Sequence, residues 1–92
     1  MSTSKRKKSE MNQQRELWRR AAASVIAATR RDKDITQEQF AAQMGLSHDT
    51  VANLESGRRK IEVGDLVMAA MVLDEKPATL FQRTLQWMNK AS

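Results

Sequence analysis

The chain has 92 residues, 40% of them hydrophobic, with one proline, three glycines and no cysteine; this suits one small all-helical domain and excludes a disulfide framework or a cysteine-based metal site. No apolar stretch approaches the ~20 residues that span a bilayer, and no hydrophobic signal segment follows the basic N-terminus, so we expect a cytoplasmic protein without membrane contact. The net charge of +5 belongs to the first 20 residues, since residues 21–92 carry equal numbers of basic and acidic side chains.

The first 14 residues, MSTSKRKKSEMNQQ, show no apolar periodicity and predict a disordered, flexible arm in front of a domain that spans residues 15–90. The arm carries the basic run Lys5-Arg6-Lys7-Lys8. Such a run can contact phosphates or enter a DNA minor groove, and it can equally be a solvated tail. The sequence leaves both interpretations open.

A long first helix is predicted from Met11 or Arg15 to Arg31, because apolar residues recur there at helical spacing. Three consecutive alanines, residues 21–23, raise the helix propensity and allow a neighbouring helix to approach closely. We expect Trp18 to pack against the core rather than to bind a ligand.

Residues 36–57 predict two short helices joined by a tight turn. Thr36 can cap the first of them, and Gln39 can complete a capping box three residues later. Gly45 stands where the chain must reverse, a position that often requires a positive φ. The segment therefore reads as a helix-turn-helix.

The second of these helices, from Ser47 to Ser56, is predicted to have one buried and one exposed face. Val51 and Leu54 point inward at the three-residue spacing of one helical face, and Gly57 ends the helix. The outward set is His48, Asp49, Ala52 and Asn53, with Thr50 on the flank. Exposed polar side chains on such a helix can read the edges of base pairs in a DNA major groove.

An ordered set of residues carries a resemblance to a known family. The set is Arg30, Gln37, Ala41, Gly45, Ser47, Val51, Leu54, Glu55, Ser56, Gly57, Leu66, Ala70 and Leu73. Over roughly residues 17–82 the chain resembles the phage repressor and Cro-like (XRE-type) helix-turn-helix family. The resemblance implies a compact all-α fold of five helices, repressor-like in architecture.

The resemblance also implies that His48, Asp49 and Asn53 read bases. Asn53 can bond bidentately to adenine N6 and N7, and Asp49 can accept from cytosine N4. His48 can donate to a guanine acceptor or to a phosphate. Because the chain has one histidine and no cysteine, we predict no metal site.

In the family, the residues that match Arg30 and Glu55 form an ion pair between the first helix and the end of the reading helix. The charges are opposite here too, so the resemblance implies the same pair. We expect it to fix the angle of the reading helix more than it adds stability, since exposed pairs contribute only ~0–1 kcal/mol.

Positioning groups are expected around the reading residues. Gln37, Ser47 and Thr50 lie near helix N-termini, where they can hydrogen-bond phosphates. The basic run Arg58-Arg59-Lys60 follows Gly57 directly and suits phosphate contacts, although a charge run is in many proteins only a solvated loop.

Residues 61–74 and 77–90 predict the two remaining helices. The expected buried residues of the former are Val63, Leu66, Val67, Ala70 and Leu73, and those of the latter are Leu80, Phe81 and Leu85. Trp87 and Met88 add apolar surface at the end of the last helix, where they are candidates for a dimer contact.

The predicted function is a sequence-specific double-stranded DNA-binding transcriptional regulator, a repressor that binds a palindromic operator as a homodimer. The alternative is an antitoxin-like or adaptor protein whose main role is to bind a protein partner. No nucleophile–base pair, paired carboxylates or Gly-rich phosphate loop is present, so an enzyme is not expected. Neither a cofactor nor a small-molecule ligand is predicted.

Overall fold

The computed structural model describes residues 7–91. Five α-helices make up this part of the chain, and no strand occurs in it: α1 (Lys8–Asp32), α2 (Gln37–Met44), α3 (His48–Glu55), α4 (Val63–Val72) and α5 (Pro77–Ala91). The predicted all-α, five-helix architecture is confirmed.

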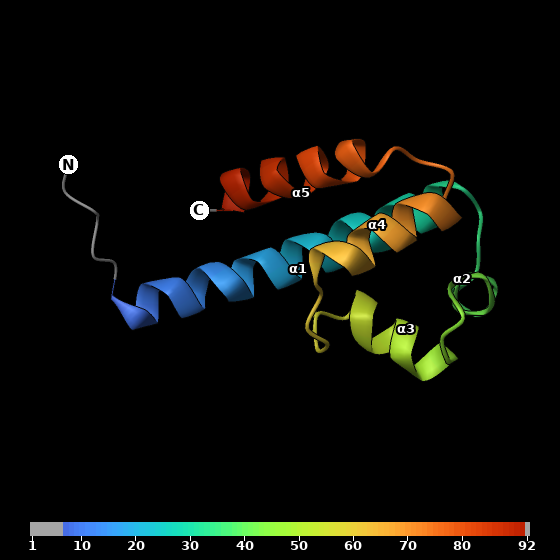
Figure 1. Ribbon diagram of the computed structural model, residues 1–92, viewed down its shortest axis with the longest axis horizontal. Coiled ribbons are helices and arrows are strands. Elements are labelled where there is room, and N and C mark those ends of the chain that lie inside the picture. Colours follow the sequence, from blue (N-terminus) through green and yellow to red (C-terminus); the bar gives the residue numbers. More distant parts are fainter. Residues whose placement is uncertain (1–6, 92) are drawn as a thin grey trace.

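Helix α1 organises the molecule (Figure 1). Helix α5 runs antiparallel along one side of α1 and makes the most extensive contact with it, while α2 and α3 lie together on the other side (Figure 1). Helix α4 packs against α1, α2 and α5. The N-terminal part of α1 extends beyond the other helices, which gives the molecule its length of 47 Å against widths of 24 and 20 Å (Figure 1).

The helix-turn-helix forms as its capping residues predict. The Thr36 hydroxyl accepts from the Gln39 backbone N–H at 3.1 Å, and the Thr36 N–H donates to Gln39 Oε1 at 2.9 Å, which completes the capping box. Gly45 reverses the chain with φ +71°, a backbone conformation that is unfavourable for residues that carry a Cβ atom. Ser47 then caps α3 by accepting from the Thr50 N–H at 3.1 Å.

One hydrophobic core joins all five helices. Its largest fully buried apolar side chains are Ile26, Phe40, Val51, Leu54, Leu66, Leu73 and Leu80. Trp18 packs at its edge, as expected: its indole N–H donates to the Ile61 carbonyl at 2.8 Å, and its ring lies 5.9 Å from that of Phe81. The core therefore holds α3 from behind and leaves its outer face to solvent.

Helix α1 begins earlier than predicted. Residues 8–14, which were assigned to the flexible arm, are helical and exposed. The prediction was wrong because it required an apolar face, and an exposed helical segment needs none. Glu10 in the first turn of α1 favours helix formation. Residues 1–6, which include Lys5 and Arg6 of the basic run, lie outside the described residues.

Helix α5 carries two apolar stripes, whereas the sequence pattern predicts one. Leu80 and Thr84 are buried and Trp87 packs half-buried beside them, while Phe81 and Leu85 remain 39% and 46% exposed. The buried stripe includes a threonine because its hydroxyl donates to the Leu80 carbonyl at 2.8 Å and needs no other partner. Phe81 and Leu85 were therefore wrongly assigned to the core.

Val63 was also wrongly assigned to the buried face of α4. It is the first residue of that helix and is 57% exposed. The preceding residue, Glu62, donates its backbone N–H to Asp65 Oδ2 at 2.9 Å, which fixes the helix start there. Burial on α4 begins one turn later, with Leu66.

Candidate nucleic-acid interface

Helix α3 presents a polar face that has no other helix over it. Val51 and Leu54 anchor its inner side in the core. On the outer side His48, Asp49 and Asn53 are exposed. These are the three side chains predicted to read bases, and the structure brings them together on one surface of one helix. Their contact with bases stays a prediction.

A bidentate ion pair sets the position of the end of α3. Arg30 donates from Nε to Glu55 Oε2 at 2.7 Å and from Nη2 to Glu55 Oε1 at 3.0 Å. The third donor, Nη1, bonds the Ile35 carbonyl at 2.6 Å. The two side chains are only 10% and 5% exposed, so this is a nearly buried pair and not the exposed pair expected from the sequence.

Gln37 extends this pair toward the reading face. Its Nε2 donates to Glu55 Oε1 at 2.9 Å, and its Oε1 lies 3.1 Å from His48 Nε2. A carboxylate only accepts, so Glu55 fixes which end of the Gln37 amide faces it. The amide oxygen then faces His48, and Nε2 of His48 must carry a proton.

The continuous chain Arg30–Glu55–Gln37–His48 therefore runs from α1 to the first residue of the reading helix. Gln37 was predicted to contact a phosphate. In the structure both ends of its amide are engaged within the protein, with one amide proton left for an outside acceptor.

Ser47 and Thr50 form the start of the reading helix. Their hydroxyl groups lie 2.8 Å apart, and Ser47 Oγ also accepts the Thr50 N–H. The two hydroxyl groups predicted to contact phosphates are therefore already hydrogen-bonded to each other at the start of α3. An anion there would be met by a helix N-terminus and a hydroxyl together.

The basic run after α3 is held against the end of that helix. The backbone N–H groups of Arg58 and Arg59 both donate to the Asn53 carbonyl, at 3.1 and 3.2 Å. Gly57, with φ +80°, makes this tight return possible. The side chains of Arg58, Arg59 and Lys60 are exposed beside the reading face.

Two further cations lie close to this loop and were not among the predicted site residues. Arg15 and Arg19 of α1 line a cavity together with Lys60. The sequence does contain a signal for them, because Lys8, Asn12, Arg15 and Arg19 recur at the spacing of one helical stripe. All four residues are polar, so apolar periodicity does not reveal the stripe.

The two residues predicted as dimer contacts lie on different faces of α5. Trp87 packs against the core and lines a hollow with Arg20 and Gly57, near the end of α3. Met88 lies on the outer side, in an apolar groove with Phe81 and Leu85. Only Met88 is thus placed on the exposed apolar surface.

A family model described as Helix-turn-helix matches residues 26–80 of this chain. The chain belongs to the XRE-type helix-turn-helix family. The family is one of DNA-binding transcription regulators, and the matched residues contain α2, α3 and the whole Arg30–Glu55 bridge. The resemblance stated from the sequence is confirmed.

Solved structures share the fold of this XRE-type protein. Two crystal structures of the clp gene regulator ClgR from Corynebacterium glutamicum are each 22% identical to it. One covers 80% of this chain and 79% of its own, with a TM-score of 0.75. The other covers 77% and 91%, with a TM-score of 0.71. No curated protein matches the sequence.

A third similar structure is a mutant of the restriction-modification controller protein C.Esp1396I. It is 19% identical, covers 78% of this chain and 96% of its own, and gives a TM-score of 0.70. In the XRE-type protein, none of the helices within residues 7–91 is long and apolar enough to cross a membrane.

Proposed function

We propose that this protein is a cytoplasmic repressor that binds a palindromic operator in double-stranded DNA as a homodimer. The observation that carries the proposal is the outer face of α3. His48, Asp49 and Asn53 stand exposed on it, and the basic run 58–60 borders it. This arrangement offers base-reading groups at the centre of an interface and phosphate-binding groups at its edge.

Each reading residue suits a particular base edge. Asn53 offers an amide for bidentate bonding to adenine, and Asp49 offers an acceptor for cytosine N4. His48 directs Nε2 at the amide oxygen of Gln37, so Nδ1 is the ring nitrogen left for a base or a phosphate. Phosphate contacts would fix the register, made by the side chains of Arg58, Arg59 and Lys60 and by Gln37, Ser47 and Thr50 near the starts of α2 and α3.

The dimer part of the proposal rests on the outer stripe of α5. Phe81, Leu85 and Met88 lie along one side of that helix and form an apolar groove with Met11 and Val63. A single reading helix covers only a few base pairs, too few to select a site in a genome. A two-fold contact through this stripe would supply the second reading helix and cover the exposed apolar side chains.

Selection of binding sites from random DNA tests the function. We expect a two-fold symmetric site whose half-sites lie about one helical turn, roughly 34 Å, apart. A reporter gene placed behind that site should be expressed less when the protein is present. Equal affinity for all sequences would overturn the proposed readout, and raised expression would overturn the repressor role.

Sedimentation of Leu85→Glu tests the dimer. The variant places a charge in the apolar stripe and should shift the protein toward monomer, with weaker operator binding. Gln86→Glu is the matched control, because Gln86 is the exposed neighbour outside the stripe and receives the same acidic side chain. A Leu85→Glu dimer as stable as the wild type would place the interface elsewhere.

The alternative function, an antitoxin-like or adaptor protein, is favoured by the same apolar groove alone. It predicts a wild-type chain that sediments as a monomer at high micromolar concentration and selects no DNA sequence. That pair of results would replace the repressor proposal with the adaptor.

A further inference from the structure

The N-terminal half of α1 carries a polar stripe with three cations on it. Lys8, Asn12, Arg15 and Arg19 are separated by four, three and four residues, which places them on one side of the helix. The acidic residue Glu10 lies outside this spacing. The stripe therefore places three positive charges along one side of the exposed end of α1.

The direction of the stripe follows from its continuation. The same spacing leads to Ala22 and Ile26, which are fully buried in the core that all five helices share. The stripe therefore lies on the side of α1 that turns into the core further along the helix. Where α1 extends past α3 (Figure 1), the stripe residues Lys8, Asn12 and Arg15 are exposed.

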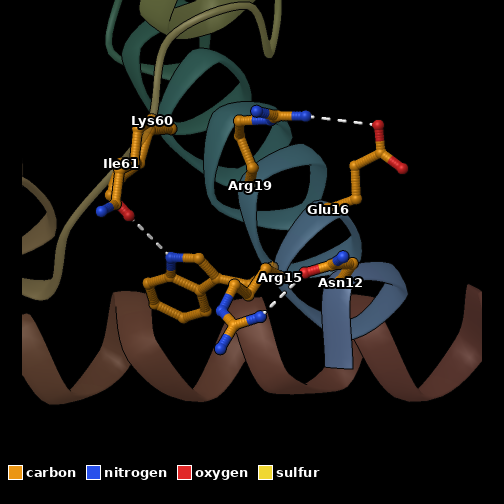
Figure 2. Close-up of a pocket in the computed structure, with 7 residues that line it drawn as sticks. Asn12, Arg15, Glu16, Arg19, Lys60 and Ile61 are labelled. Atoms are coloured by element: carbon orange, nitrogen blue, oxygen red, sulfur yellow. Dashed lines mark hydrogen bonds and ion pairs between the residues drawn. The ribbon is translucent and has the colours of Figure 1, made fainter. Parts of the chain in front are cut away.

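The loop after α3 joins the stripe. Lys60 and Ile61 line an open cavity of about 560 Å³ with Asn12, Arg15, Glu16 and Arg19 (Figure 2). The bond from the Trp18 indole to the Ile61 carbonyl holds the loop at this place. The cavity has three cationic side chains and one carboxylate, so its charge is positive.

The internal bonds of the cavity leave donors unused. Arg15 Nη1 donates to Asn12 Oδ1 at 3.0 Å, and Arg19 Nη2 bonds Glu16 Oε1 at 3.3 Å (Figure 2). Arg19 Nε is buried with no hydrogen-bond partner in the part of the chain that the structure describes. A guanidinium offers five donors, so both arginines can take an anion in addition to these bonds.

We propose that this stripe, completed by Lys60, binds backbone phosphates of the DNA that flanks the sequence read by α3. The inference rests on the proposed function and deepens it, because it assigns to α1 a contact outside the helix-turn-helix. Lys8 to Arg19 span about 16 Å along the helix axis, the length of about five base pairs. Contacts to phosphates alone would add affinity without reading sequence.

The test compares two duplexes that contain the selected site. One ends at the site, and the other continues for about ten base pairs on each side. Arg15→Gln with Arg19→Gln should leave binding to the short duplex unchanged. On the long duplex it should weaken binding by about tenfold per lost contact near 0.1 M salt and lower the salt slope by about one per contact.

Two controls accompany the double variant. Lys76→Gln with Arg83→Gln removes the same charge near the start of α5, where Arg83 pairs with Glu75. This variant should bind both duplexes with wild-type affinity. Glu16→Gln removes the carboxylate that holds Arg19 and should strengthen binding to the long duplex. A role of Arg19 in folding alone would not produce this opposite sign. Circular dichroism should show the wild-type fold for all of them.

The outcomes separate the inference from the function beneath it. A wild-type chain that selects no DNA site overturns the proposed function. A wild type that binds its site, with a double variant whose salt slope on the long duplex is unchanged, overturns the stripe alone. Equal losses on the short and long duplexes also overturn it, since they would place both arginines within the sequence that α3 reads.

Discussion

The two halves of α1 share a helical geometry and have opposite surroundings. From Ala21 to Arg30 most side chains of the helix are buried, and they pack against the other helices. From Lys8 to Glu16 every side chain is exposed. Residues 21–30 hold the reading helix in place, whereas residues 8–16 pack against little of the rest of the protein.

An ion pair in each half shows the same difference. Arg30 and Glu55 are 25 residues apart in sequence, bidentate and nearly buried. Arg19 and Glu16 are neighbours on one helix, joined at 3.3 Å, with side chains 33% and 66% exposed. A buried pair holds two elements in a fixed geometry, while an exposed pair exchanges readily with water or with an incoming anion.

Arg30→Ala should have the largest effect on stability. It removes one member of a buried pair and leaves the Glu55 carboxylate with only the Gln37 amide, as well as an unbonded Ile35 carbonyl. We expect a loss of about 3–5 kcal/mol in the free energy of unfolding. Urea denaturation followed by circular dichroism measures it.

Arg31→Ala is the matched control for this substitution. Arg31 is the next residue of α1 and is exposed, so its loss should change stability by less than about 0.5 kcal/mol. Equal losses in the two variants would mean that the Arg30–Glu55 pair behaves as a surface pair, and the contrast between the halves of α1 would lose its energetic basis.

Asn53→Ala should have the next largest effect, this time on DNA binding. Asn53 is exposed on α3 and contributes nothing to the core, so the fold should be retained. We expect a loss of about 1–3 kcal/mol on the selected site and a far smaller one on random DNA. Competition binding on the two kinds of duplex gives the difference.

Arg58→Ala with Arg59→Ala provides the contrast to Asn53→Ala. These exposed cations should weaken binding to every sequence and lower the salt slope by about one per lost contact. If Asn53→Ala behaves in the same way, Asn53 does not read bases.

The helix-turn-helix could be predicted in detail because its signals are local. Thr36, Gly45 and Ser47 act on backbone groups within a few residues, so their caps and turn follow from the sequence alone. The Arg30–Glu55 contact is long-range and came from the family resemblance. Its near burial and its link through Gln37 to His48 needed the packed structure.

The terminal helices were harder because their boundaries depend on what packs against them. Both Leu80 and Phe81 are apolar, and only the position of α1 decides that Leu80 turns inward while Phe81 remains partly exposed. Thr84, which no apolar pattern points to, is buried because its hydroxyl donates to the Leu80 carbonyl of its own helix. The start of α1 at Lys8 carries no apolar signal at all.

Trp18→Phe tests the point where the two halves of α1 meet. The change keeps a ring near Phe81 and removes the hydrogen bond from the indole to the Ile61 carbonyl. We expect a loss of about 1 kcal/mol in unfolding free energy and weaker DNA binding, because Lys60 would be held less firmly. Trp87→Phe, for which a comparable long-range bond is not seen in residues 7–91, is the control. A stability change no larger than that of the control would show that the loop needs no anchor on α1.

Deletion of residues 1–10 should have the smallest effect on stability. Residues 7–10 are exposed, and none of the residues removed belongs to the core that the structure describes. We expect the free energy of unfolding to change by less than about 0.5 kcal/mol, while DNA affinity at low salt falls because the run Lys5-Arg6-Lys7-Lys8 is lost. Thermal melting and a salt titration of binding measure the two effects. A large fall in melting temperature would show that the first turn of α1 supports the fold, and the contrast between its halves would then begin further along the helix.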